Sequence, residues 1–364
     1  MLRDKIFFSL PTPNPSQRKS SPVFVMGCHR SGTNLLYDML LSSGGFALYR
    51  GYLPIYKVLI PRFGPMSNRT SRKKIVATWL RSKGFRRTGL AADQLSARIL
   101  SECQTGGDFI RVVMDSVAEQ QNASRWAVYD PDNVLHCERV KKDIPNALFV
   151  HIIRDGRDIA LSLKKMGGFA PLPWDRAETN SLVATALYWK WMVRRGRAAG
   201  RLFPADYIEV RYEDLITNPR ETLSTLGRFI DHDLDYDQIQ RAALGRLSET
   251  NSSFREEERK EEIHPLGRWK ERLSAASVAA IEATVGDCLE ENGYPLSLPA
   301  TERRASLRLS PRLSMMRSMY PAFLGGKLWL KLHTPVGRFA NISALELAED
   351  PPTLPGRPVS EKSS

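Results

Sequence analysis

The chain has few cysteines and no pattern among them that predicts a cross-link or a metal site. Its four cysteines form no C-x-x-C pair, and its six histidines show no spacing typical of metal ligands. A disulfide scaffold and a zinc module are therefore excluded as the basis of the fold, and isolated thiols suit a reducing, cytoplasmic compartment. We expect no bound metal.

Long apolar runs are lacking as well. The first 20 residues hold only a short apolar run before prolines and polar residues, which predicts neither a signal peptide nor a membrane span. Residues 320–332 form the longest apolar stretch near the C-terminus, but Gly325, Gly326 and two lysines interrupt it. It is too short to cross a bilayer, so the sequence predicts a soluble chain.

Charge, by contrast, is abundant and mostly positive. The 364 residues include 42% hydrophobic and 26% charged side chains, enough to build a core. Arginine and lysine number 53 against 40 acids, which gives a net charge of +13. This excess favours an anionic partner, namely a nucleotide, a nucleic acid, an acidic sugar or a membrane surface, without choosing among them.

The chain divides by composition into four parts. Residues 1–20 predict a flexible leader, 21–298 a catalytic domain, 299–345 a basic amphipathic arm and 346–364 a disordered tail. Residues 301–340 alone carry eight arginines and lysines against one glutamate. This arm predicts either an amphipathic helix at a membrane surface or a segment packed on the core or on a dimer partner, and we favour packing.

Apolar runs and turn residues predict alternating strands and helices. Buried strands are expected at 23–26 and 147–153, and shorter ones at 46–49, 127–129 and 207–210. A helix is expected to begin at Thr33, and others to span 109–120, 134–142, 158–165, 179–197, 220–230 and 275–291. This order predicts an α/β fold with a central parallel sheet flanked by helices.

The first strand leads into a glycine-bounded loop, Gly27-Cys28-His29-Arg30-Ser31-Gly32-Thr33. Its glycines permit close backbone approach, and its amides with the next helix N-terminus form an anion site. Nucleotide-hydrolysing enzymes have lysine after the second glycine, whereas here Thr33 follows directly and Arg30 lies inside the loop. The loop is poorly suited to a magnesium triphosphate, but a plain strand–helix junction stays an alternative.

A second anion corner follows the strand at 147–153, in the run Arg154-Asp155-Gly156-Arg157-Asp158-Ile159-Ala160-Leu161-Ser162. An arginine at a strand's carboxyl end points into the crevice where ligands bind in open α/β sheets. Ser162 lies two turns into the next helix and can face the same space. Together they can clamp a second phosphate, although an ion pair from Arg154 to a nearby aspartate is the alternative.

These segments resemble a sulfotransferase that uses 3′-phosphoadenosine 5′-phosphosulfate (PAPS). GCHRSGTNLL is similar to the family's 5′-phosphosulfate loop, FVHIIRDGRDIALS to its 3′-phosphate motif and LGRWKERL to its late G-x-W-K segment. The resemblance spans residues 22–296 and implies a core like that of the P-loop nucleotide hydrolases. It also implies PAPS as co-substrate, adenosine 3′,5′-bisphosphate as product, and no metal.

The resemblance assigns a role to each matching residue. Contacts to the 5′-phosphate and the sulfuryl bridge would come from Arg30, Ser31, Gly32, Thr33 and Asn34, and Arg30 would also stabilise the charge that grows on the leaving phosphate. Arg154 and Ser162 would bind the 3′-phosphate, and Tyr212 would lie near the adenine. A late loop of Gly267, Arg268, Trp269 and Lys270 would close over the nucleotide, although Trp269 is also a natural core residue.

The match departs from the family at the reaction centre. Many members have lysine where Tyr129 stands, and a tyrosine supplies no charge. The general base is missing from its usual place, so Asp130 is the first candidate and His136 the second, with His29 a third near the acceptor. Asp130 has an equal claim as a helix cap, and a helical histidine such as His136 is commonly structural.

Sulfuryl transfer to a hydroxyl, or less readily an amine, of a small molecule, glycan or lipid is therefore the function expected. The acceptor and the oligomeric state, including a homodimer, stay open, and we expect no nucleic-acid partner. Two alternatives remain: a kinase or nucleotide hydrolase with a degenerate phosphate loop, and a non-catalytic basic protein that binds anions. The first predicts magnesium dependence, and the second predicts affinity that falls steeply with salt.

Overall fold

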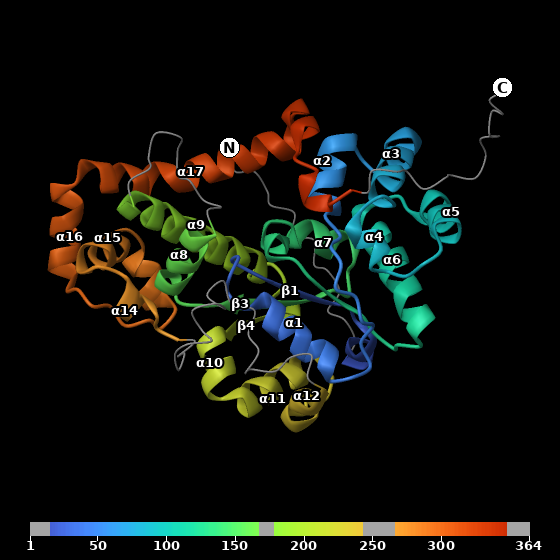
Figure 1. Cartoon of the computed structure of the whole chain (residues 1–364), viewed down its shortest axis with the longest axis horizontal. Coiled ribbons are helices and arrows are strands. Elements are labelled where there is room, and N and C mark those ends of the chain that lie inside the picture. The colour runs from blue at the N-terminus through green and yellow to red at the C-terminus, as the bar shows by residue number, and fades with distance from the viewer. Residues whose placement is uncertain (1–14, 167–177, 243–265, 348–364) are drawn as a thin grey trace, which may run out of the picture.

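The fold is built around a sheet of four parallel strands. In the computed structural model, which describes residues 15–166, 178–242 and 266–347, the strands lie in the order β2-β1-β3-β4 (Figure 1). They span β1 (Val23–Gly27), β2 (Ala127–Tyr129), β3 (Leu148–Ile153) and β4 (Tyr207–Arg211). All pairings between neighbours are parallel, which confirms the predicted sheet.

The strand predicted at 46–49 is wrong. Phe46 makes one isolated bridge to Arg125, and no ladder follows it. The backbone of Leu48 is satisfied by a side chain instead, because its N–H donates to Gln121 at 2.7 Å and its carbonyl accepts from the same amide at 3.0 Å. With its hydrogen bonds made in this way, the segment stays extended without joining the sheet.

Helices cover both faces of the sheet because alternate residues of the central strand point in opposite directions. The first face carries α6 (Gly106–Gln121), α9 (Glu178–Gly200) and α15 (Ala275–Glu291). The second carries α1 (Thr33–Ser42), α10 (Tyr212–Thr217), α11 (Pro219–Ile230) and α12 (Tyr236–Ala242). Phe24 and Met26 of β1 belong to a large core with α6, α9 and α15, whereas Val23 and Val25 pack in a second core with α1, α11 and α12. The predicted helices over these ranges are confirmed.

The remaining elements are short helices and the C-terminal pair. They are η1 (Pro15–Ser20), the π-helix η2 (Ile55–Leu59), α2 (Ile60–Phe63), α3 (Arg69–Trp79), α4 (Lys83–Arg86), α5 (Ala92–Glu102), η3 (Pro131–Leu135), α7 (Cys137–Asp143), α8 (Gly156–Lys165), η4 (Pro204–Asp206), α14 (Trp269–Arg272), α16 (Ala300–Leu309), α17 (Pro311–His333), η6 (Pro335–Phe339) and η7 (Ser343–Leu345). The single helix predicted over 134–142 is divided between η3 and α7.

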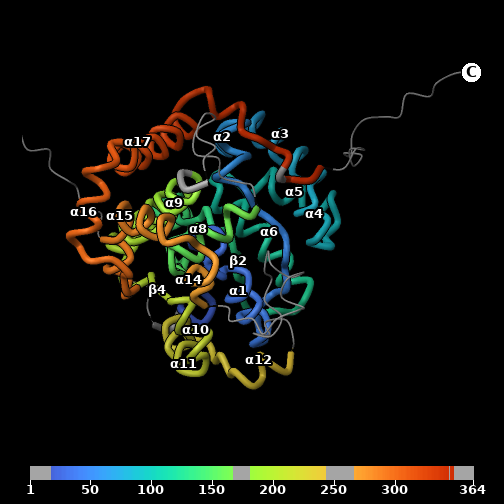
Figure 2. The backbone as a smooth tube through the Cα atoms, turned by 60° about the vertical axis from the view of Figure 1, so that its left-hand side comes forward, coloured from blue at the N-terminus to red at the C-terminus, as the bar shows by residue number. Residues whose placement is uncertain are grey.

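The two ends of the chain meet the core differently. Arg18 of η1 donates to the carbonyls of Phe229 and Ala205, so the end of the predicted leader is fastened to the domain. Residues 1–14 of that leader and 348–364 of the predicted tail lie outside the described residues. Near the C-terminus, α16 and α17 pack against α15 and α9, and α17 runs along the outer edge of the molecule (Figures 1 and 2).

Candidate functional site

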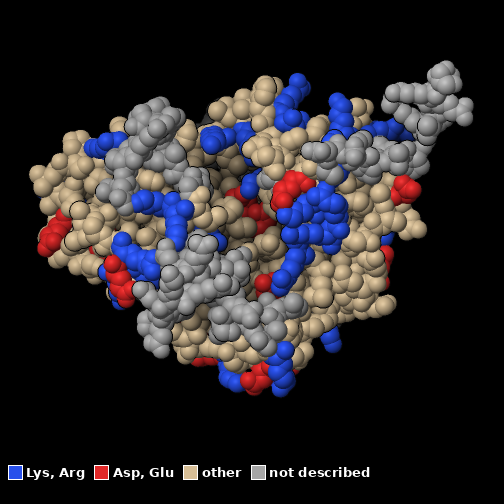
Figure 3. Space-filling model, in the orientation of Figure 1, with Lys and Arg blue, Asp and Glu red and all other residues tan. Residues whose placement is uncertain are grey.

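A crevice opens at the carboxyl ends of β1 and β3. These strands run side by side with Gly27 opposite Ile152, so the loops that follow them meet at one edge of the sheet. The crevice encloses a cavity of about 280 Å³. Its lining consists of His29, Arg30, Gly32, Thr33, Asn34, Leu35, Tyr129, Pro131, Arg154, Asp158, Leu161, Ser162, Met166, Tyr212 and Arg268. On the face of the molecule shown in Figure 3, lysine and arginine side chains gather around a central hollow.

The loop between β1 and α1 adopts the conformation that its glycines predict. Gly32 has φ +97°, and a Cβ there would lie 2.5 Å from a ring carbon of Tyr212. Arg30 also has a positive φ, at 72°, so the backbone turns sharply at this residue of the loop. Ser31 is fully buried, and its hydroxyl has no hydrogen-bond partner among the described residues. A tight loop with an unsatisfied buried hydroxyl is well suited to cradle an anion.

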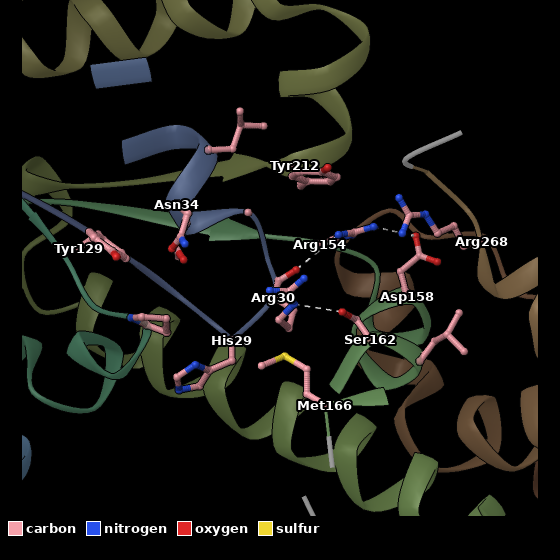
Figure 4. Close-up of a pocket in the computed structure, with 15 residues that line it drawn as sticks. His29, Arg30, Asn34, Tyr129, Arg154, Asp158, Ser162, Met166, Tyr212 and Arg268 are labelled. Carbon is pink, nitrogen blue, oxygen red and sulfur yellow. Dashed lines mark hydrogen bonds and ion pairs between the residues drawn. The ribbon is translucent and has the colours of Figure 1, made fainter. Parts of the chain in front are cut away.

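Arginines from the two loops come together over the crevice. Arg30 Nε donates to the Ser162 hydroxyl at 3.1 Å, and Arg154 donates to the Arg30 carbonyl at 3.5 Å. The Arg154 guanidinium lies 4.4 Å from the centre of the Tyr212 ring and 3.7 Å from the Asp158 carboxylate. Both residues that the sequence predicts for separate phosphates therefore face one cavity, and the ion pair to Asp158 exists beside that arrangement (Figure 4).

Asp158 also fixes the late loop. Its two carboxylate oxygens accept from the backbone amides of Gly267 at 2.9 Å and Trp269 at 3.0 Å. Burial raises the pKa of Asp158 although Arg154 opposes the rise. Of the four predicted residues in this loop, Arg268 lines the crevice, whereas Gly267, Trp269 and Lys270 do not.

Trp269 lies against a buried ion cluster. The Arg157 guanidinium stacks on its ring at 3.8 Å and pairs with Asp155 at 2.8 Å and with Glu282 at 2.7 Å. The Arg157 and Glu282 side chains are 1% and 0% exposed. Trp269 is thus a buried anchor through which α8, α15 and the late loop are held together.

The opposite side of the crevice carries a different set of charges. His29 lines the cavity, and its Nε2 lies 3.4 Å from the Asp132 carboxylate, which also pairs with Lys57 from η2. Burial raises the pKa of Asp132, but His29 and Lys57 outweigh burial and hold it below its usual range. Lys57 keeps a raised pKa against burial because Asp132 and Asp130 lie beside it.

The crevice has two walls that differ in their side chains. One wall, the arginine wall, consists of Arg30, Arg154, Ser162 and Arg268. The other, the histidine wall, consists of His29 and Tyr129, together with Asp132, which pairs with His29, and Lys57, which pairs with Asp132. Figure 4 shows Arg154, Ser162 and Arg268 on one side of the cavity, His29 and Tyr129 on the other, and Arg30 between them. Sequence inspection missed Lys57 and Asp132, because neither belongs to a phosphate motif.

The first two candidate bases do not line this cavity. The Asp130 side chain caps η3 by accepting from the Asp132 amide at 3.0 Å, and burial together with the Asp132 charge raises its pKa to about 6. His136 is buried at the start of α7, and burial lowers its pKa to about 4.

The described residues contain neither a metal-binding cluster nor a membrane-spanning helix. Over 15–166, 178–242 and 266–347, no group of three histidine, cysteine, aspartate or glutamate side chains is arranged to hold a metal ion. Within the same ranges no helix has both the length and the apolar character needed to cross a membrane.

Comparison with known proteins identifies the family. The model of the sulfotransferase family matches residues 22–237, which is more than half of the chain. The sulfotransferase domain of the olefin synthase from Synechococcus PCC 7002 is similar in structure, with a TM-score of 0.50, 19% identity, and coverage of 77% of this chain and 96% of that chain. Sulfotransferase STF9 from Mycobacterium avium also matches, with a TM-score of 0.42, 16% identity and coverage of 77% and 79%. No protein of curated function matches the sequence. The chain belongs to the sulfotransferase family, and this membership supports sulfotransferase activity.

Proposed function

We propose that the protein transfers a sulfuryl group from PAPS to a hydroxyl, or less readily an amine, of a small-molecule, glycan or lipid acceptor. The observation that carries this proposal is the convergence of Arg30 and Arg154 on one cavity. Two guanidinium groups from separate loops suit a ligand with two anionic ends, since each can form charge-assisted hydrogen bonds to a phosphate or sulfate.

The residues present fit such a donor. Ser31 offers a buried hydroxyl without a partner among the described residues, and Gly32 leaves room beside Tyr212 that a Cβ would fill. The 5′-phosphosulfate would be held by Arg30, Ser31, Gly32, Thr33 and Asn34. The 3′-phosphate would be held by Arg154 and Ser162, with the adenine near Tyr212. Arg268 would add charge from the late loop, which Gly267, Trp269 and Lys270 shape.

The chemistry assigned to the chain is charge stabilisation and proton removal. PAPS supplies the sulfuryl group when bound, and adenosine 3′,5′-bisphosphate is the product that leaves. Arg30 and the loop amides at the start of α1 are oriented before reaction, so they stabilise negative charge on the departing phosphate without reorganising. The acceptor hydroxyl must lose its proton as it attacks, which requires a base on the same cavity.

His29 is the base that the geometry favours. It lines the cavity and has the buried Asp132 carboxylate within ion-pair distance of Nε2. A carboxylate in that place holds the Nε2 proton and leaves Nδ1 as the acceptor, the division of roles found in histidine–aspartate pairs generally. Asp130 and His136 are weaker candidates, because the Asp130 side chain caps η3 and the His136 side chain is buried in the core.

Calorimetric titration tests the donor. Adenosine 3′,5′-bisphosphate, AMP and ATP with magnesium are each titrated into wild type, Arg154→Ala and Arg220→Ala. The last is the control, because Arg220 pairs with Asp237 on the exposed surface outside the crevice. We expect the bisphosphate to bind wild type and the control alike, and at least tenfold more tightly than AMP, with this preference lost in Arg154→Ala.

Two results would overturn the proposal. Equal affinity for the bisphosphate and AMP would show that the crevice has no site for a 3′-phosphate. Tighter binding of ATP with magnesium than of the bisphosphate would favour a kinase or nucleotide hydrolase instead.

A further inference from the structure

Large apolar side chains cover the outer face of α17. Met315, Met319, Phe323, Trp329 and Leu330 are each 44–62% exposed. At 3.6 residues per turn these five positions fall within an arc of about 120° on the helix. The long helix runs along the outer edge of the molecule in both views (Figures 1 and 2), and the exposure of the five side chains shows that the stripe faces solvent.

Packing of the helix on its own domain does not account for the stripe. Met316 and Tyr320 are buried on the inner side, and Leu313 and Leu324 pack against the same core. The outer stripe is a second apolar face. Gly326 lies within it, and a Cβ built there would meet nothing within 4 Å, so the glycine serves no close contact inside the chain.

The ionised side chains of α17 are all basic. Between Pro311 and His333 the sequence contains Arg312, Arg317, Lys327 and Lys331 and no aspartate or glutamate. At 3.6 residues per turn, Arg312 lies within the apolar arc and Lys327 lies about 40° beyond its edge at Phe323, and both are exposed. An apolar stripe with cations within it and beside one edge matches a surface that is apolar inside and anionic outside.

We propose that the outer face of α17 docks onto an anionic phospholipid surface, with the helix lying in the plane of the interface. A second copy of the chain fits this face less well, because a symmetric contact would bring identical cations together. A ridge of long side chains on a peripheral helix also suits insertion among acyl chains better than closure over a flat protein. This inference is independent of the proposed sulfuryl transfer, since it uses no residue of the crevice.

Vesicle sedimentation tests the proposal. Full-length protein is spun with vesicles of phosphatidylcholine alone and with vesicles containing about one third phosphatidylserine, at low and high salt. We expect binding only to the anionic vesicles, weakened at least fivefold by the high salt. Phe323→Ser with Trp329→Ser should weaken binding at least tenfold. Leu48→Ser is the control, because Leu48 is 51% exposed and its backbone is hydrogen-bonded to Gln121 of α6, outside α17.

Folding and self-association are measured on the same samples. Circular dichroism and titration with adenosine 3′,5′-bisphosphate should be unchanged in the double variant, which separates loss of docking from loss of the fold or of the nucleotide site. The proposal is overturned if wild type does not bind anionic vesicles, or if the double variant binds them as well as wild type. It is also overturned if light scattering shows a lipid-free dimer that the double variant converts to a monomer.

Discussion

The two walls of the crevice handle charge in different ways. On the arginine wall, the guanidinium groups of Arg30, Arg154 and Arg268 line the cavity and offer hydrogen-bond donors to anions. On the histidine wall, the Asp132 carboxylate lies within ion-pair distance of both His29 and Lys57. We propose that the first wall holds the anionic donor while His29 on the second accepts a proton, two tasks that sulfuryl transfer needs at one cavity.

The walls also differ in how they are supported. The arginine wall is supported by the buried ion pairs of Arg157 and by the late loop, whose Gly267 amide donates to Asp158. The histidine wall depends on one carboxylate, Asp132, shared between a loop histidine and a lysine from a single π-helical turn. We expect the first wall to govern stability and donor affinity, and the second to govern turnover.

The largest effect should come from breaking the support of the arginine wall. Arg157→Met leaves the Asp155 and Glu282 carboxylates without their shared cation in a dry site, which costs about 3–5 kcal/mol of unfolding free energy. Urea denaturation followed by circular dichroism measures the loss. Arg220→Met removes an exposed ion pair and should change stability little. Equal stability of the two variants would show that the buried cluster does not hold the wall.

Gly32→Ala tests the shape of the same wall. Alanine at position 32 would have to adopt the positive φ of the glycine, and its Cβ would collide with the Tyr212 ring. Either the loop or the ring must therefore move. We expect affinity for adenosine 3′,5′-bisphosphate to fall about thirtyfold, equivalent to about 2 kcal/mol. Gly89→Ala is a matched control, since Gly89 also has positive φ, at +69°, but meets nothing closer than 3.8 Å. A similar fall in both variants would point to backbone strain rather than to the crevice.

The arginine wall could be predicted from the sequence because each of its parts follows a strand. Arg30 lies in a glycine-bounded loop after β1, and Arg154 follows β3, so pattern and topology together place them at one edge. The histidine wall gave no such signal. Lys57 comes from a π-helical turn with no periodic pattern, and its contact with Asp132 joins segments about 75 residues apart.

The same physical limit explains the mistaken strand at 46–49. Its residues have the composition of a strand, but whether they join a ladder depends on what their amides meet in space. Here Gln121, from the end of α6, takes up the backbone groups of Leu48. Local pattern predicts an extended segment, and only tertiary contacts decide between a sheet and a side-chain partner.

Asp132→Asn tests the division of labour between the walls. The amide keeps the size of the carboxylate but removes the charge shared by His29 and Lys57. With any hydroxyl acceptor that turns over, we expect kcat to fall roughly tenfold while the affinity for adenosine 3′,5′-bisphosphate stays unchanged. In a His29→Asn background the same change should have little further effect, because residues that act as a unit are not additive. Additive losses would show that Asp132 acts apart from His29.

Ser162→Ala should have the smallest effect on nucleotide affinity. It distinguishes a serine that contacts the ligand from one that only orients Arg30. The hydroxyl accepts from Arg30 Nε at 3.1 Å, so its loss removes one hydrogen bond and weakens nucleotide binding about threefold to fivefold, or about 1 kcal/mol. Calorimetry with two ligands separates its roles. If Ser162 contacts the 3′-phosphate, the variant loses affinity for adenosine 3′,5′-bisphosphate but not for AMP. If Ser162 only orients Arg30, both ligands lose affinity equally, because both carry the 5′-phosphate that Arg30 would hold. The first result assigns Ser162 to the ligand, and the second makes it a positioning residue for Arg30.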